Sequence, residues 1–175
     1  MIVKRLKAFH KKQAGFTLIE MLVAMVITGL ISLGASVSTT QVLNQTIHNN
    51  DYTTASHNAM NALHWISRDA LMAQTVNGTT GFPATQSLSL GWQGWDNDTY
   101  SVNYTLTNGQ LRRIFSDGVN TTTTLVAENI NPNQNLTYCI SGNGTLTINI
   151  TASVGQGAKV VNVTEVQQIS CRPGL

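Results

Sequence analysis

The chain has 175 residues, of which 42% are hydrophobic and only 10% are charged, and its formal net charge is +2 at pH 7. Soluble domains average about 25% charged residues, so this chain is poor in charge. Five of the ten Lys and Arg residues lie within residues 1–15, and all eight acidic residues follow them. The rest of the chain is therefore mildly acidic, which excludes the broad basic surface typical of nucleic-acid binding.

A basic leader precedes an apolar stretch that contains one carboxylate. The leader holds no acidic residue and five basic ones: Lys4, Arg5, Lys7, Lys11 and Lys12. Because basic segments stay on the cytoplasmic side of a membrane, this distribution predicts a cytoplasmic N-terminus and an exported C-terminal part. The apolar stretch, residues 16–36, is long enough to cross the hydrocarbon core, yet it includes Glu20. A charge there costs roughly 2.5–3.5 kcal/mol on insertion scales, so it normally has a partner and a function.

The position of Gly15 distinguishes this leader from a secretory signal peptide, which is cleaved after its apolar region. Gly15 lies before the apolar region. A cut between Gly15 and Phe16 would therefore leave the apolar segment attached and expose the α-amine of Phe16. Phe16 and Glu20 are four residues apart and share one face of a helix. We expect the Phe16 ammonium to pair with the Glu20 carboxylate of its own chain or of a neighbouring one.

The basic leader, the Gly15-Phe16 pair, Glu20 and the apolar run after it resemble the N-terminal signal of type IV prepilins and of type II secretion pseudopilins. This resemblance implies that a membrane aspartate peptidase, the prepilin peptidase, cleaves between Gly15 and Phe16 and N-methylates Phe16. It also implies that Glu20 guides assembly into a helical filament with other pilin or pseudopilin subunits. The motif covers only the start of the chain and leaves the kind of filament open.

Apolar periodicity predicts one long helix over residues 16–76. Up to residue 33 the apolar side chains occur on all faces, as a membrane or fibre-core segment requires. Further along they narrow to one stripe with steps of four and three: Ala59, Leu63, Ile66, Ala70 and Ala73. Asn77-Gly78 and the following Gly81-Phe82-Pro83 are then expected to form the turns that end the helix. The second half of the helix is therefore expected to lie on a sheet.

Short strands are predicted after the helix. Residues 100–107 alternate between apolar and polar side chains, and Asn108-Gly109 is a strong signal for a two-residue hairpin turn. The other predicted strands are residues 87–90, 110–115, 124–129, 136–140, 145–151 and 159–166. A helix followed by strands predicts an α+β fold, in which the long N-terminal helix packs on a C-terminal antiparallel β-sheet head. The resemblance implies the pilin fold.

These patterns divide the chain into three predicted segments. Residues 1–15 form the cleaved leader, residues 16–76 the helix, with residues 16–36 as its membrane or fibre core, and residues 77–175 the head. The segment from Ala59 to Val76, with Arg68-Asp69 near its end, resembles the helix end of J-type minor pseudopilins and W-type minor pilins. The alternative is that Arg68 and Asp69 form a solvated face. The resemblance favours a low-copy minor subunit over a major pilin.

Cys139 and Cys171 are the only cysteines, and both fall in the predicted exported head. An even number of cysteines in an oxidising compartment predicts a disulfide. Closing a loop of about 33 residues would stabilise the head by roughly 3.5–4 kcal/mol in the chain-entropy model. A redox or metal site would need closer spacing or additional ligands. Major pilins commonly have a C-terminal disulfide loop, which keeps a major pilin as an alternative.

No residue pattern indicates an enzyme, a cofactor or a metal site. The helix histidines lack the four-residue spacing of two ligands on one turn, and Asp96-Asn97-Asp98 lacks the twelve-residue calcium pattern, so this segment is expected to be a polar loop. Trp92 and Trp95 are expected to pack against the sheet, and an exposed Trp would suit a partner contact. The nine Asn-x-Thr sequences reflect an Asn- and Thr-rich composition, with glycosylation as the alternative.

The sequence therefore predicts a non-enzymatic, minor structural subunit of a type IV pilus or a type II secretion pseudopilus. It would be anchored in the inner membrane before assembly, with its head periplasmic or extracellular. Two alternatives stay open: a major pilin, and a lone membrane-tethered binding domain. Secretion, adhesion, motility and DNA uptake use the same subunit design, so the machine is not identified by these residues.

Overall fold

The computed structural model describes residues 15–77, 87–142 and 144–172. By their internal contacts the residues divide into two compact units, Met1–Gln45 and Thr46–Leu175. The boundary between the units falls inside the long helix α1, Leu18–Met72. The predicted α+β class is confirmed, because this helix is followed by antiparallel strands.

Helix α1 is continuous over 55 residues, as the apolar periodicity predicts. It passes without a break through Gly29 and Gly34, the two glycines in its first half. Its hydroxyl side chains bond back to the carbonyl oxygen four residues earlier, which satisfies polar groups on an otherwise apolar surface. These side chains are Thr28, Ser32, Ser36, Thr39, Thr40 and Thr53. The part of the first unit that the structure describes, from Gly15 to Gln45, is thus almost entirely helical with an apolar exterior.

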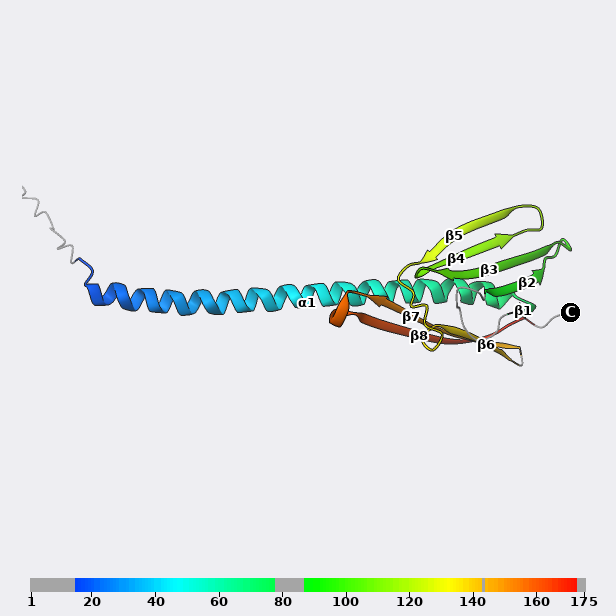
Figure 1. Ribbon diagram of the computed structural model, residues 1–175. Coiled ribbons are helices and arrows are strands. Elements are labelled where there is room, and N and C mark those ends of the chain that lie inside the picture. The colour runs from blue at the N-terminus through cyan, green and yellow to red at the C-terminus, as the bar shows by residue number, and fades with distance from the viewer. Residues whose placement is uncertain (1–14, 78–86, 143, 173–175) are drawn as a thin grey trace, which may run out of the picture. The chain divides into compact units, whose positions relative to one another are not determined.

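The second unit contains a five-stranded sheet in which sequence neighbours pair in the order β1-β2-β3-β4-β5, all antiparallel (Figure 1). Its strands are β1 Thr75–Asn77, β2 Leu88–Gln93, β3 Thr99–Thr107, β4 Gln110–Ser116 and β5 Thr121–Ala127. The predicted hairpin at Asn108-Gly109 is confirmed, because both residues have positive φ, 51° and 76°, as a type I′ turn requires.

A second, three-stranded antiparallel sheet has the order β6-β7-β8. Its strands are β6 Tyr138–Gly142, β7 Thr145–Val154 and β8 Val161–Ser170, and the short 3-10 helix η1, Gly157–Lys159, connects β7 to β8. A single bridge between Ile130 and Ala152 links the connection after β5 to this sheet. The sequence predicted the strands but not their division into two sheets.

The second half of α1 packs against both sheets. Figure 1 shows the two sheets of this unit on either side of the helix. Asn61 donates to the carbonyl oxygen of Val126 at the end of β5, and Ser67 donates to the Gln167 side chain in β8. Apart from Ile66 and Asp69, the buried face of the helix consists of small side chains: Ala55, Ala59, Ala62 and Ala70. Small residues allow the helix to approach both sheets closely, so one core lies along this face.

One sequence-based expectation and one alternative for this region need correction. Asn77, expected to begin the turn that ends the helix, lies in β1, a three-residue edge strand that pairs with β2. The helix ends at Met72 instead. Asp69 is not on a solvated face, because its side chain is fully buried. The remaining expected turn, around Gly81 and Pro83, lies outside the described residues.

Candidate processing and assembly site

Helix α1 begins with a capping box formed by Thr17 and Glu20. The Thr17 backbone N–H and the Thr17 hydroxyl both donate to Oε2 of Glu20, each at 2.8 Å. In return, the backbone N–H of Glu20 donates to the Thr17 hydroxyl oxygen at 3.4 Å. The Thr-Leu-Ile-Glu sequence fits the S/T-x-x-E pattern, so the sequence contained this signal, which our reading of the motif missed. Glu20 therefore also helps to cap the N-terminus of α1.

The carboxylate of Glu20 can accept a further hydrogen bond. Both bonds from Thr17 are accepted by Oε2. Among the described residues no donor contacts Oε1, and a carboxylate oxygen accepts up to two hydrogen bonds. Since Glu20 also lies in the first turn, near the partial positive charge of the helix N-terminus, the geometry suits an acidic residue.

Gly15 and Phe16 precede the helix in an open segment. The side chain of Phe16 is 85% exposed. A Cβ atom added at Gly15 would meet no atom within 4 Å, so this chain's own fold does not require glycine there. Any requirement for a small residue at Gly15 must come from a partner. The expected pairing of the Phe16 amine with Glu20 needs a free amine, which an uncut Gly15-Phe16 peptide bond does not supply.

The segment that follows has the composition of a membrane span. Every described residue from Gly15 to Asn50 is exposed. Of the described helices, α1 alone is long and apolar enough to cross a membrane, with a mean hydropathy of 2.2 over its best 18-residue window. A signal sequence near an N-terminus passes the same test. Whether α1 begins a retained membrane anchor or a cleaved signal sequence therefore depends on the residues around Gly15.

Residues 10–36 match the family model described as the prokaryotic N-terminal methylation motif. The chain carries a methylation motif. The matched range includes Gly15, Phe16, the capping box and the first half of the apolar segment. Comparison with curated proteins finds no match, and comparison with solved structures finds none.

The methylation motif supports a class III signal peptide, of the kind found in type IV pilin-like proteins, at the start of the chain. Such a motif supports a pilin or pseudopilin subunit, and it implies processing by the prepilin peptidase and assembly with other pilins. The apolar helix and the methylation motif together fit an inner-membrane-anchored protein. The motif says nothing of the head, which the family match does not cover.

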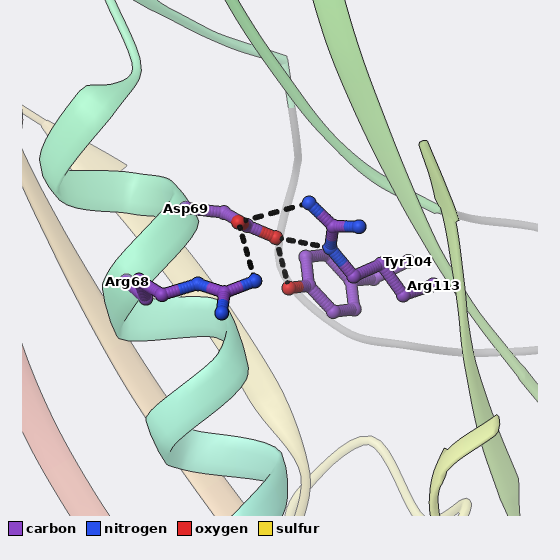
Figure 2. Close-up of polar contacts among 4 residues, drawn as sticks. All are labelled: Arg68, Asp69, Tyr104 and Arg113. Carbon is purple, nitrogen blue, oxygen red and sulfur yellow. Dashed lines mark hydrogen bonds and ion pairs between the residues drawn. The ribbon is translucent and has the colours of Figure 1, made fainter. Parts of the chain in front are cut away.

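Within the head, a buried ionic cluster connects α1 to the five-stranded sheet. Oδ2 of Asp69 accepts hydrogen bonds from Tyr104 Oη at 2.5 Å and from Arg113 Nε at 2.6 Å, while Oδ1 accepts one from Arg113 Nη2 at 3.1 Å. Figure 2 shows Tyr104 and Arg113 converging on Asp69, which α1 contributes. The neighbouring Arg68 is a more distant partner, 3.8 Å from Oδ1 and half exposed. The cluster satisfies a carboxylate that α1 buries completely.

The same cluster shifts the titration of its partners. Burial and the hydrogen bond to Asp69 raise the pKa of Tyr104 well above its ordinary value. Burial alone would lower the pKa of Arg113, but the hydrogen bonds and charge of Asp69 outweigh it and raise the pKa. Tyr104 is therefore held as a neutral donor and Arg113 as a cation. These are the properties of a structural clamp, since neither Tyr104 nor Arg113 is set to exchange a proton near neutral pH.

The two cysteines lie on opposite sides of β7. Cys139 in β6 is opposite Ile148, whereas the N–H of Cys171, just after β8, donates to the carbonyl oxygen of Gly144. Two strand spacings and four residues along β7 put the Cα atoms roughly 17 Å apart. A disulfide needs about 4.4–6.8 Å. Both cysteines are free thiols in the structure. The disulfide between them is not confirmed; it stays a prediction that requires β6 or the end of β8 to leave the sheet.

The described residues contain no group of three or more His, Cys, Asp or Glu side chains arranged to hold a metal ion. Asp96 accepts hydrogen bonds from the Tyr100 hydroxyl at 2.8 Å and from the backbone N–H of Asp98 at 3.2 Å. These bonds, the one from Tyr100 above all, lower the pKa of Asp96. Asp96 therefore organises the turn between β2 and β3.

The expectation that Trp92 and Trp95 both pack against the sheet was half right. Trp92 is partly buried and stacks on Tyr100, with ring centroids 5.9 Å apart. Trp95 is 99% exposed, because it lies in the turn after β2 rather than in the strand.

Proposed function

We propose that this protein is a structural subunit of a type IV pilus or a type II secretion pseudopilus. In this proposal the prepilin peptidase cuts between Gly15 and Phe16 and N-methylates Phe16, and the apolar half of α1 anchors the subunit in the inner membrane until it enters the filament. The observation that carries the proposal is the methylation motif over residues 10–36, which includes the cleavage pair. The basic leader supports a cytoplasmic N-terminus and an exported head.

Glu20 is proposed as the assembly contact. The Thr17 bonds use only Oε2, so Oε1 can accept a hydrogen bond from the new ammonium of Phe16 on an adjacent subunit while the capping box stays formed. Cleavage leaves Thr17 in the mature chain, so the helix keeps its cap. The carboxylate would then serve both its own helix and its neighbour.

We favour a low-copy minor subunit over a major pilin. The resemblance of the segment around Arg68-Asp69 to J-type and W-type minor subunits suggested this role, but the comparisons lend it no support. The buried position of Asp69 gives the Arg-Asp pair a structural role that either kind of subunit could use. Copy number in purified filaments distinguishes the two, and a protein absent from filaments would instead be a membrane-tethered binding domain.

The test of processing is the mass of the mature chain. We expect assembled material to begin at Phe16 with one N-methyl group, as seen by intact-mass and peptide mass spectrometry. An intact Met1 terminus, or cleavage after the apolar segment at Ser36 or Ser38, would contradict the proposal. Gly15→Ala should be tolerated better than a bulky substitution, since the peptidase must approach this backbone closely.

The test of assembly is Glu20→Gln. This variant should insert into membranes at least as well as the parent, because a charge that is costly in lipid is removed. Its recovery in sheared filaments relative to membranes should fall, because the Phe16 ammonium loses its counter-charge, and breaking a buried pair costs about 3–5 kcal/mol. Val23→Ala is the control, since it trims the same helix without changing charge. Equal incorporation of Glu20→Gln and the parent would show that Glu20 is not an assembly contact.

A further inference from the structure

Strand β8 is a long sheet edge without the features that normally protect such an edge. It has 10 residues, it is the outer strand of its sheet, and its register with β7 is regular throughout. Native edge strands are blunted by short length, by bulges, by Pro or by charged side chains, Lys above all. β8 contains no Lys, Arg or Pro, and Glu165 is its only charged residue. Its whole length is therefore open to pairing with another strand.

The other sheet edges that the structure describes are protected. β1 and β6 are short, with 3 and 5 residues. The pairing of β5 with β4 is irregular at Leu111 and Arg112, and the carbonyl oxygen of Val126 near the end of β5 accepts a hydrogen bond from Asn61. Short strands, bulges and covered ends all hinder the addition of a further strand. β8 differs from these edges in being both long and regular.

The backbone groups of every second residue of β8 point away from β7. Just after β8, the N–H of Cys171 donates to the carbonyl oxygen of Gly144 directly opposite. Because antiparallel pairs alternate between bonded and unbonded, odd-numbered residues of β8 bond to β7 and even-numbered residues direct their N–H and C=O groups outward. Within the described part of the chain these outward groups have no backbone partner. A row of alternating donors and acceptors fits an extended polypeptide rather than a small molecule.

We propose that β8 pairs with β8 of a second copy of this chain, antiparallel, about a two-fold axis at Val166. The outward-pointing residues of one copy then face those of the other, which allows about ten backbone hydrogen bonds. They are Asn162, Thr164, Val166, Gln168 and Ser170. Both strands pair over their full length, so the two three-stranded sheets join into one continuous sheet. Such an interface is isologous and closes at two copies.

The apolar side chains of β8 are complementary to themselves in this register. Val163 and Ile169 face the core and are almost fully buried, and each lies opposite the other across the axis. Their pairing extends the core-facing apolar row into the second copy. Val166 is 60% exposed on the outer face and lies opposite the same residue of the second copy. Cross-strand pairs of β-branched side chains stabilise a sheet, so this complementarity favours a second copy over an unrelated strand.

The single charge of β8 selects the same register. An axis at Glu165 would place two carboxylates directly opposite each other, which is unfavourable, and an axis at Gln167 would place Glu165 opposite Ile169. With the axis at Val166, Glu165 lies opposite Gln167. The Oε1 atom of Gln167 accepts a hydrogen bond from Ser67, so its Nε2 group can donate to the carboxylate of the second copy.

The symmetry determines where the second copy lies. A two-fold axis reverses the direction of β8 and with it the direction of the second half of α1, which packs against the same sheet. Two subunits side by side in one membrane point the same way and cannot pair in this manner. The second copy is therefore expected on a separate membrane or filament. The pairing does not require either copy to have entered a filament, so its failure would leave the proposed function untouched.

The test is self-association of the full chain in phospholipid nanodiscs that hold one chain each. Sedimentation velocity over a concentration series separates single discs from pairs, and we expect pairs to form as the concentration rises. Val166→Lys should weaken pairing tenfold or more, because it places two ammonium groups opposite each other at the axis. The matched control is Ile140→Lys, which adds the same charge at an exposed apolar side chain of β6 and should leave pairing unchanged. Near-ultraviolet circular dichroism confirms that each variant is folded.

Two variants at one position test the register. Gln167→Lys places an ammonium opposite Glu165 of the second copy and should tighten pairing by roughly threefold to tenfold. Gln167→Glu places a carboxylate there and should weaken pairing by a similar factor. Opposite responses to the two substitutions are expected only if Glu165 lies across the axis from this position.

Cross-linking locates the axis directly. In a background of Cys139→Ser and Cys171→Ser, Val166→Cys should form a disulfide between two chains, because directly opposed residues that exchange hydrogen bonds have Cα atoms about 5.5 Å apart. Gln168→Cys in the same background should not, because four residues along the strands separate its two copies by roughly 14 Å.

Four results would overturn the proposal. The first is that discs carrying the folded parent stay single throughout the concentration series, which would leave the edge of β8 to a different polypeptide. The second is that Val166→Lys pairs as well as the parent. The third is that the two substitutions at Gln167 change pairing in the same direction. The fourth is that Gln168→Cys cross-links as readily as Val166→Cys.

Discussion

Replacement of Asp69 by Asn tests whether the buried cluster connects the helix to the sheet. The variant keeps the shape of the side chain and removes the charge that Arg113 and Tyr104 both contact. Breaking a buried pair typically costs 3–5 kcal/mol. The Arg113 side chain remains 12% exposed and lies against the rings of Trp65 and Phe115, which partly stabilise the cation. We therefore expect Asp69→Asn to lower the free energy of unfolding by about 3 kcal/mol, the lower end of this range.

A loss of this size is measurable by thermal unfolding. For a unit of this length, 1 kcal/mol corresponds to roughly 3–5 °C, so the melting temperature should fall by about 10 °C. The assay is near-ultraviolet circular dichroism of the full chain in nanodiscs, because Trp65 packs beside the cluster and reports its loss.

The matched control is Arg68→Ala, which removes the half-exposed partner 3.8 Å from the same carboxylate. Exposed pairs contribute about 0–1 kcal/mol, so this variant should stay close to the parent. A double-mutant cycle of Asp69→Asn with Arg113→Met should give a coupling energy well above 1 kcal/mol, since the two residues are in direct contact. If Asp69→Asn destabilises no more than Arg68→Ala, or if the cycle shows no coupling, the cluster does not hold the helix to the sheet.

Three further predictions follow from the same geometry. Because folding raises the pKa of Tyr104, its contribution to the free energy of unfolding is fully present below the unfolded pKa near 10 and is lost as the pH rises above that value. Tyr104→Phe should remove this part of the alkaline destabilisation. The measurement is the difference in unfolding free energy between the parent and the variant at pH 9 and at about pH 11. If the β6-β7-β8 register holds, alkylation after denaturation without reductant should label both cysteines, and a Cys139–Cys171 disulfide would show that a strand has moved. In the native protein the Cys139 thiol should be alkylated more slowly than that of Cys171, because burial strongly raises the pKa of Cys139. Thr17→Val should weaken the capping box between residues 17 and 20 by about 1 kcal/mol and so lower the helicity at the start of α1. Faster amide hydrogen exchange in this turn would report the change, and unchanged exchange would show that the capping box is dispensable.

The sequence allowed local features of the fold to be predicted where short-range chemistry decides them. The Asn108-Gly109 hairpin was predictable because these two residue types accept positive φ, and the helix was predictable from its apolar spacing. Strand β1 was missed because a three-residue edge strand has no periodicity to detect. The exposure of Trp95 was missed because its residue type favours burial, while the turn around it decides otherwise.

Long-range features of the site could not be obtained this way. Arg113 and Asp69 are 44 residues apart, and their meeting depends on how the sheet packs on α1. The pattern before Asp69 allowed only the statement that Arg68-Asp69 lies near the end of the helix. The proposed processing site could be formulated from the sequence because its residues are contiguous, from Gly15 to Glu20, and Thr17 and Glu20 form their contacts within a single turn of helix.

The boundary between the two units inside α1 has a consequence for how the protein loses its structure. Residues after Thr46 share a core with the sheets, and the helix buries its first side chain at Ala55. Melting the head must therefore take the second half of α1 with it, whereas the first half depends on whatever surrounds it, lipid or other subunits. A single continuous helix thus belongs to two cooperative blocks. Pulling force or heat applied to the head would fray this helix from its C-terminal end, and the membrane half could outlast the domain it carries.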